Sequence, residues 1–293
     1  MGVIPARQPL RLRSVFISDV HLGFRGCRAD YLLHFLDSTD AQQIFVIGDL
    51  IDFWSLRRQM YWPPAHQEVL RKLLTLARTG TRVVYIPGNH DELCRDLCGS
   101  QYGPVEVHRE YLHETADGRR LLLLHGDEFD EAVKFGALLK RVGCAAYDAI
   151  IRVNHVVHRL RRRMGYGYWS LADWIKHQVP DAVDYIDRFE RAAAAEARRR
   201  GLDGVICGHI HRPALREIDG VLYCNDGDWV ESCTSLVEDH NGRLAVLRWT
   251  EAEMGTVERT GTVPVFSAAP QMATAQSSVN GGCPDFREPD VAA

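Results

Sequence analysis

Short apolar runs recur along the first half of this chain, separated by longer amphipathic stretches. Residues 15–17, 44–47 and 83–86 are rich in β-branched and aromatic side chains, a composition that predicts buried strands. Residues 29–38 and 67–78 place their apolar side chains at helical spacing. This alternation predicts parallel strands joined by right-handed helical crossovers.

The second half has a different pattern. Residues 121–124 and 204–207 predict two further buried strands. Four short strands are then predicted at 215–218, 221–224, 234–237 and 244–249, with Asp219-Gly220 and Asn241-Gly242 as hairpin turns. The chain therefore ends in antiparallel sheet, and the whole pattern predicts an α/β fold with a two-sheet sandwich flanked by helices.

A long insertion separates the strands at 121–124 and 204–207. The 83 residues between His125 and His209 exceed a plain crossover, and most of them have helical patterns. We expect a helical cap insertion at 129–200, over a core formed by 14–128 and 201–250. Residues 1–13 are an expected N-terminal extension, and 262–293, poor in large apolar residues, are an expected disordered tail.

The composition narrows the class of protein. The chain has 293 residues, of which 46% are hydrophobic and 25% charged, as in soluble globular proteins. The net charge of −4 gives no reason to expect a nucleic-acid partner. Because the chain has neither a bilayer-spanning apolar stretch nor an apolar signal segment in 1–13, we expect a cytoplasmic protein whose eight cysteines are reduced.

Five polar motifs follow the predicted strands in a fixed order. Carboxylate, imidazole and amide groups of this kind bind hard or borderline divalent cations, and residues that follow successive strands converge in open α/β sheets. The five motifs are Asp19-Val20-His21, Gly48-Asp49-Leu50-Ile51-Asp52, Gly88-Asn89-His90-Asp91, His125-Gly126-Asp127 and Gly208-His209-Ile210-His211.

These motifs supply enough ligands for two divalent cations that clamp a phosphoryl group. The predicted set is Asp19, His21 and His211 for one ion, Asn89, His125 and His209 for the other, and Asp49 as the bridge. The charges suit an anionic phosphate, because two cations outweigh two aspartates and one attacking hydroxide.

One motif histidine is left over for catalysis. His90 is not needed as a ligand, so it can donate to a phosphate oxygen or protonate the leaving oxygen. Asp52 or Asp91 is a candidate to orient a neighbouring imidazole, and Asp127 is a candidate to do so near His125.

The five motifs resemble those of the calcineurin-like metallophosphoesterases, with every ligand position filled between about residues 15 and 249. The resemblance implies an αββα sandwich of two mixed sheets and a di-metal centre, often containing manganese. It also implies the ligand roles given above, with His90 as the motif histidine.

Within that superfamily, residues 18–23 and 48–54 and the helical insertion resemble the UDP-2,3-diacylglucosamine hydrolases of lipid A synthesis. Those enzymes cleave a pyrophosphate at the inner face of the cytoplasmic membrane and give UMP and a diacylglucosamine 1-phosphate. His90 departs from their well-studied branch, which has Arg there, and residues 224–231 resemble a less characterised branch. The expected substrate contacts are Asn89, His90, Asp130, Lys134, Arg163, Lys176 and His209.

Two questions stay open at this point. A helix over 145–164 would carry an arginine-rich arc beside an apolar arc, which suits either an anionic membrane surface or packing on its own domain. The substrate is either a nucleotide-lipid pyrophosphate or, because His90 replaces Arg, a soluble phosphodiester or phosphomonoester. A non-catalytic binding scaffold would need missing ligands, and none is missing.

Overall fold

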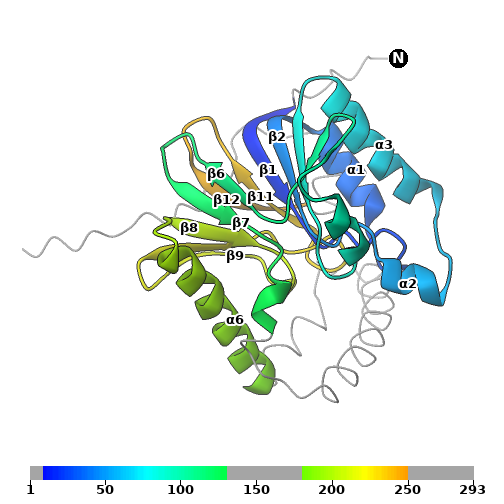
Figure 1. Ribbon diagram of the computed structural model, residues 1–293. Coiled ribbons are helices and arrows are strands. Elements are labelled where there is room, and N and C mark those ends of the chain that lie inside the picture. Colours follow the sequence, from blue (N-terminus) through cyan, green and yellow to red (C-terminus); the bar gives the residue numbers. More distant parts are fainter. Residues whose placement is uncertain (1–8, 131–179, 250–293) are drawn as a thin grey trace, which may run out of the picture.

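Two mixed β-sheets pack face to face, with helices on both outer faces (Figure 1). The computed structural model describes residues 9–130 and 180–249. The predicted α/β sandwich of two mixed sheets flanked by helices is therefore confirmed. Residues 131–179, which hold most of the expected cap, lie outside the described part, so the division into core and cap stays a prediction.

The first sheet has seven strands in the order β12-β11-β1-β2-β3-β5-β4. Strands β1, β2, β3 and β5 run parallel, while β4, β11 and β12 pair antiparallel with their neighbours. The parallel pairing predicted from the strand–helix alternation is confirmed. The bounds are β1 Leu10–Ile17, β2 Thr39–Ile47, β3 Arg82–Ile86, β4 Gln101–Tyr102, β5 Val105–Val107, β11 Thr234–Glu238 and β12 Leu244–Arg248.

The second sheet has five strands in the order β6-β7-β8-β10-β9. Its central strands β7, β8 and β10 are parallel, and β6 and β9 are antiparallel edges. The turn between β9 and β10 has φ of 50° at Asp219 and 80° at Gly220, as the predicted hairpin requires. The bounds are β6 Tyr111–Glu114, β7 Arg120–Leu123, β8 Gly204–Cys207, β9 Ala214–Ile218 and β10 Val221–Asn225.

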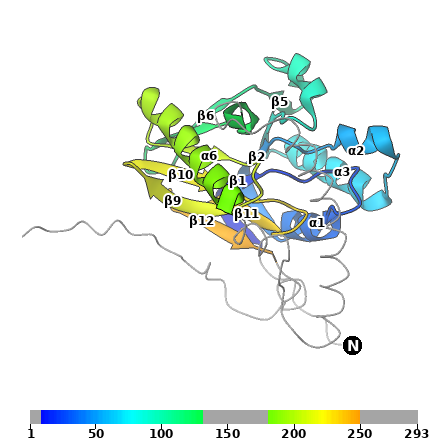
Figure 2. The same cartoon turned by 90° about the horizontal axis from the view of Figure 1, so that it is seen from below.

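The helices cover the two outer faces of the sandwich. Helices α1 (Ala29–Asp37) and α3 (Pro64–Arg78) pack on the first sheet, whereas α6 (Pro180–Arg199) packs on the second (Figures 1 and 2). Three shorter elements are α2 (Phe53–Arg58) and the 3-10 helices η1 (Glu92–Leu97) and η2 (Asp127–Asp130). None of the helices in the described ranges has the length and apolar character needed to cross a bilayer.

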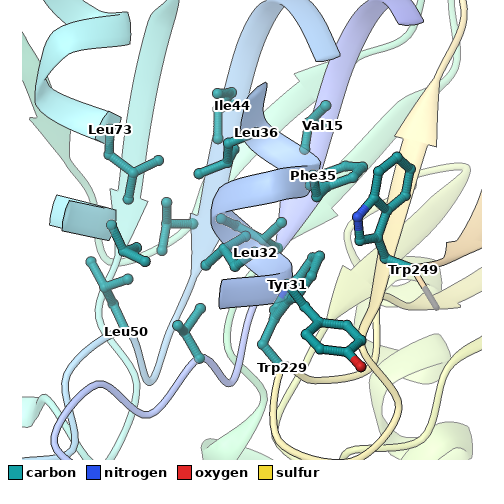
Figure 3. Close-up of a cluster of buried hydrophobic side chains, with 14 of the residues drawn as sticks. Val15, Tyr31, Leu32, Phe35, Leu36, Ile44, Leu50, Leu73, Trp229 and Trp249 are labelled. Atoms are coloured by element: carbon teal, nitrogen blue, oxygen red, sulfur yellow. The ribbon is translucent and has the colours of Figure 1, made fainter. Parts of the chain in front are cut away.

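Apolar side chains fill the three spaces between these layers. Under α1, Leu32 and Phe35 meet the first sheet and the indole rings of Trp229 and Trp249 (Figure 3). Between the sheets, the buried apolar side chains of β1, β2 and β3 face those of β7 and β8. This packing holds the strand ends in place, and with them the loops that follow the strands.

A buried ion network also joins the two sheets. Glu238 of β11 accepts hydrogen bonds from Arg13 at 2.7 Å, from Ser14 at 2.6 Å and from His113 of β6 at 2.8 Å. Burial alone would raise the pKa of Glu238, but the bonds from His113 and Ser14 and from the Ala116 N–H hold it below its ordinary value. Glu238 is therefore an ionised anchor between the sheets.

Candidate metal centre

All five motifs lie in loops that directly follow parallel strands. Strands β1, β2 and β3 of the first sheet end at residues 17, 47 and 86, and strands β7 and β8 of the second end at 123 and 207. Because parallel strands end at the same edge of a sheet, the five loops gather at one edge of the sandwich. The hydrogen bonds from the Asp19 N–H to Gly48 and from the Gly208 N–H to His125 tie neighbouring loops together.

Three of the predicted ligands form one compact group. His211 Nε2 lies 3.1 Å from Asp19 Oδ1, and His21 Nε2 lies 3.7 Å from the same oxygen. The two imidazole Nε2 atoms are 3.3 Å apart. One ligand atom from each of these side chains lies within 4.8 Å of the others, as a shared cation requires.

Asp49 lies between this group and the remaining ligands. Its Oδ2 is 3.8 Å from His21 Nε2 on one side and 3.4 Å from His125 Nε2 on the other. Asn89 Oδ1 is in turn 3.2 Å from His125 Nε2. This intermediate position is the one that a bridging carboxylate needs.

His209 borders the same group through its ring and its backbone. Its ring centroid is 5.2 Å from that of His125, and its backbone N–H donates to Asp19 Oδ2 at 2.8 Å. Its Nε2 lies 3.0 Å from Asp130 Oδ1, which also accepts from the Tyr185 hydroxyl of α6 at 2.5 Å. Asp130, expected as a substrate contact, therefore lies against the His209 imidazole.

The donor atoms fit divalent cations. His125 Nδ1 lies 2.9 Å from the carbonyl oxygen of Ile47, which can only accept, so Nδ1 carries a proton and Nε2 is the nitrogen available to a cation. Asp19 Oδ1 is buried and accepts no well-formed hydrogen bond within the described ranges. Asp19 and Asp49 are 0% and 2% exposed, and such buried carboxylates need a positive partner.

The backbone of these loops is strained at the same residues. Seven non-glycine residues have positive φ in the described ranges, and five of them are predicted ligands. Such conformations cost of order 1–3 kcal/mol each and cluster at functional sites. The five are Asp19, His21, Asp49, His209 and His211.

Two motif glycines make room for the ligands. A Cβ atom on Gly48 would lie 2.1 Å from His125 Nδ1, and one on Gly88 would lie 2.3 Å from Asp49 Oδ1. Gly48 also has φ of +83°, which side chains rarely adopt. The glycine that begins each of these two motifs is therefore required, because the ligand side chains approach its backbone closely.

The pKa values show strong coupling between carboxylates and imidazoles. Burial would lower the pKa of His21 and of His125, yet the aspartates beside them raise both well above the ordinary value. Burial would likewise raise the pKa of Asp19 and Asp49, yet the histidines lower both. Without cations these imidazoles hold protons, which a cation must displace in order to bind.

The catalytic candidate His90 lies at the edge of the group. Its Nε2 is 4.0 Å from Asp49 Oδ2, and its Nδ1 is 3.0 Å from Asp52 Oδ1. Asp52 Oδ2 is also 3.4 Å from His21 Nδ1, so one carboxylate faces both rings. The Trp54 indole packs against His90 with ring centroids 4.1 Å apart and the ring planes tilted by 34°, a contact that no pattern along the chain indicates.

The other two candidate carboxylates have different partners. Asp91 accepts backbone hydrogen bonds from Gly88 at 2.6 Å and Leu50 at 2.7 Å, and so ties two motif loops together. Asp127 binds Arg95 of η1 at 2.7 Å. Of the three candidates, Asp52 is the one that lies against motif imidazoles. The expected substrate contacts Lys134, Arg163 and Lys176 lie outside the described residues.

The fold is an αββα sandwich whose strand-end loops gather aspartates and histidines around a candidate metal site. Residues 12–213 match the model of the calcineurin-like phosphoesterase family, and the chain belongs to that family. The family predicted from the motifs is thereby confirmed.

Curated relatives with one name match most of the chain. UDP-2,3-diacylglucosamine hydrolase of Neisseria gonorrhoeae is 25% identical over 252 residues, covering 80% of this chain and 97% of the relative. The protein of the same name from Photorhabdus laumondii is 26% identical over 211 residues, covering 70% and 84%.

Solved structures align with the chain at lower identity. The phosphoesterase Yfce from E. coli is 14% identical with a TM-score of 0.40, covering 81% of this chain and 99% of that one. Vps29 from Entamoeba histolytica, complexed with zinc, is 12% identical with a TM-score of 0.38 and the same coverage. At these scores the two structures say nothing further about function.

Proposed function

We propose that this hydrolase cleaves the pyrophosphate of UDP-2,3-diacylglucosamine, or of a close lipid-linked analogue, to UMP and 2,3-diacylglucosamine 1-phosphate. The proposal depends above all on one observation, the Asp49 carboxylate between His21 and His125 at 3.8 and 3.4 Å. The names of the relatives, at 24–27% identity, support the choice of substrate.

The same observation supports a centre for two divalent cations, for which we propose Mn²⁺. Such cations polarise phosphoryl oxygens and lower the pKa of water. Imidazole, carboxylate and amide ligands suit Mn²⁺, although Fe²⁺ and Zn²⁺ accept the same set. The proposed holders are Asp19, His21 and His211 for one ion, Asn89, His125 and His209 for the other, and Asp49 for both.

His90 is the proposed catalytic acid. Asp52 Oδ1 lies 3.0 Å from Nδ1 of His90, and Nε2 of the same ring lies 4.0 Å from Asp49 Oδ2. A proton on Nε2 can pass to the oxygen that leaves phosphorus. The Trp54 indole packs against this ring, with centroids 4.1 Å apart.

Asn89, His90, Asp130 and His209 are proposed substrate contacts, along with Lys134, Arg163 and Lys176. The 3.0 Å contact of Asp130 with His209 supports a further role for Asp130, in orienting that imidazole. We propose a cytoplasmic protein that meets its substrate at the inner face of the membrane.

A second candidate keeps the chemistry and changes the substrate. His90 stands at the position where the well-studied branch of these hydrolases has Arg, which favours a soluble phosphodiester or phosphomonoester. An imidazole at that position would then meet a smaller anionic group.

A substrate panel with Mn²⁺ separates the two candidates. Wild type should release UMP from UDP-2,3-diacylglucosamine in detergent micelles, and Asp49→Ala should release none. Turnover of bis-p-nitrophenyl phosphate or cAMP with no UMP release would favour the soluble substrate. Metal content measured on both proteins distinguishes a lost centre from a lost reaction.

A further inference from the structure

A second aspartate lies directly behind the proposed ligand Asp19. Asp226 follows β10 and is 0% exposed. Its Oδ1 lies 2.5 Å from the Ser18 hydroxyl, and the same hydroxyl lies 2.7 Å from Asp19 Oδ2. Gly208 leaves space for the side chains of Ser18 and Asp19, because a Cβ there would lie 2.3 Å from Ser18 Oγ and 2.4 Å from Asp19 Oδ2.

The number of protons shared by Asp226, Ser18 and Asp19 decides which group donates in each of the two hydrogen bonds. A serine hydroxyl has one proton to donate, whereas an ionised carboxylate can only accept. Were Asp19 and Asp226 both ionised, one of the two short contacts of Ser18 would have no proton. Both contacts have hydrogen-bond lengths, so one of the two carboxyl groups must carry a proton itself.

The surroundings of the two aspartates identify which one carries it. Asp19 Oδ2 also accepts from the His209 N–H, and Oδ1 faces His211 at 3.1 Å, as an anion would. Asp226 Oδ2 is buried and has no hydrogen-bond partner within residues 9–130 and 180–249. A buried carboxylate oxygen without a donor is costly, whereas the carbonyl oxygen of a neutral acid is much less so.

Electrostatics agree with this assignment. Burial raises the pKa of Asp226 well above its ordinary value and the negative charge of Asp19 adds to the rise, while Ser18 and His125 oppose it.

We propose that Asp226 is a neutral carboxylic acid that positions the ligand Asp19 through Ser18. The Asp226 O–H donates to Ser18 Oγ, and the Ser18 O–H donates to Asp19 Oδ2. Together with the His209 N–H, this bond holds Oδ2 and leaves Oδ1 for a cation. The neutral acid also adds no further negative charge beside Asp19. The inference rests on the proposed role of Asp19 as a ligand.

Infrared spectra of the metal-free protein at pH 7 test the protonation directly. The wild type should have the carbonyl stretch of a protonated carboxyl group, and labelling with ¹³C-aspartate should shift that band. The band should be missing from Asp226→Asn. A labelled wild type without the band would overturn the inference, and this measurement uses neither metal nor substrate. A wild type that has the band but releases no UMP would count against the proposed function alone.

Metal affinity tests the positioning role. The amide introduced by Asp226→Asn can still donate an N–H to Ser18, so the Mn²⁺ affinity of this variant should stay within about threefold of wild type. Ser18→Ala loses the donor to Asp19 and should bind Mn²⁺ about 10–100-fold more weakly, as is usual when a ligand loses its hydrogen-bond partner. Asp226→Ala should fall between the two. If Asp226→Asn and Asp226→Ala lost Mn²⁺ affinity equally, with unchanged circular dichroism, the positioning role of Asp226 would be overturned.

Discussion

Replacing Asp52 by Asn tests how His90 is controlled. Asp52 lies 3.0 Å from His90 Nδ1 and 3.4 Å from His21 Nδ1, and it caps α2 through the Ser55 N–H at 2.7 Å. Burial would raise the pKa of Asp52, but the bonds from His21 and His90 lower it, so the residue is ionised at every pH used for assay. Asn keeps the shape and removes the charge.

The expected loss follows from these contacts. A positioned general acid contributes about 10²–10⁴-fold to the rate, and Asn presents an N–H donor or a weaker acceptor to an imidazole that needs a carboxylate. We expect kcat on a substrate with an alkoxide leaving group to fall about 100-fold. Asn is as good a helix cap as Asp, so the free energy of unfolding should change by less than about 1 kcal/mol.

The assay compares two phosphodiesters with Mn²⁺ saturating. An alkoxide leaving group needs the proton from His90, whereas p-nitrophenolate leaves without it. Asp52→Asn should therefore be much slower on the alkyl diester and only slightly slower on the p-nitrophenyl diester. Ser55→Ala is the matched control, because it removes the hydroxyl that donates to Asp52 Oδ2 at 2.7 Å and touches neither histidine. Equal loss on both diesters, or no loss on either, would refute the reasoning.

Three further outcomes are expected. Glu238→Gln should lower the free energy of unfolding by about 3 kcal/mol above pH ~4.3. Because the pKa of Glu238 in the folded protein is depressed, the difference between wild type and variant should shrink as the pH falls through that pKa. Urea unfolding at a series of pH values checks this, and a difference that grows in acid would contradict it. Gly48→Ala should weaken Mn²⁺ binding at least about tenfold, because the added Cβ clashes with His125. Gly80→Ala, at a position with φ of +112° and open space around it, should leave Mn²⁺ binding unchanged. Calorimetric titration of both variants with Mn²⁺ separates the effect of the clash from that of backbone strain. Removal of metal by a chelator should lower the Tm, and Mn²⁺ at about 100 times its Kd should raise the free energy of unfolding by about 2.7 kcal/mol. A Tm that does not change with Mn²⁺ would contradict a metal site in the folded protein.

The positions of the proposed ligands could be predicted from the sequence because each one follows an apolar run. The runs at 15–17, 44–47 and 83–86 correspond to β1, β2 and β3, and those at 121–124 and 204–207 correspond to β7 and β8. Parallel strands bring their carboxyl ends to one edge, so order along the chain is enough to predict convergence. Asp19, Asp49 and His125 meet for that reason.

The partners of the remaining carboxylates could not be predicted, because they depend on contacts between distant loops. Asp52, Asp91 and Asp127 are alike in sequence terms, yet they face imidazoles, backbone N–H groups and Arg95 respectively. Asp226 lies 207 positions from Asp19, and only the packed sandwich brings it to Ser18. Strand β4 has two residues and β5 three, which is too short for any periodic pattern.

The central claim is that the strand-end loops hold two cations around Asp49. Anomalous diffraction from crystals grown with Mn²⁺ measures this directly. We predict two manganese peaks about 3.5–4 Å apart, with Asp49 between them, and neither peak in Asp49→Ala. Crystals of the wild type with no manganese between Asp19, Asp49 and His125, or with manganese bound only elsewhere, would contradict the account.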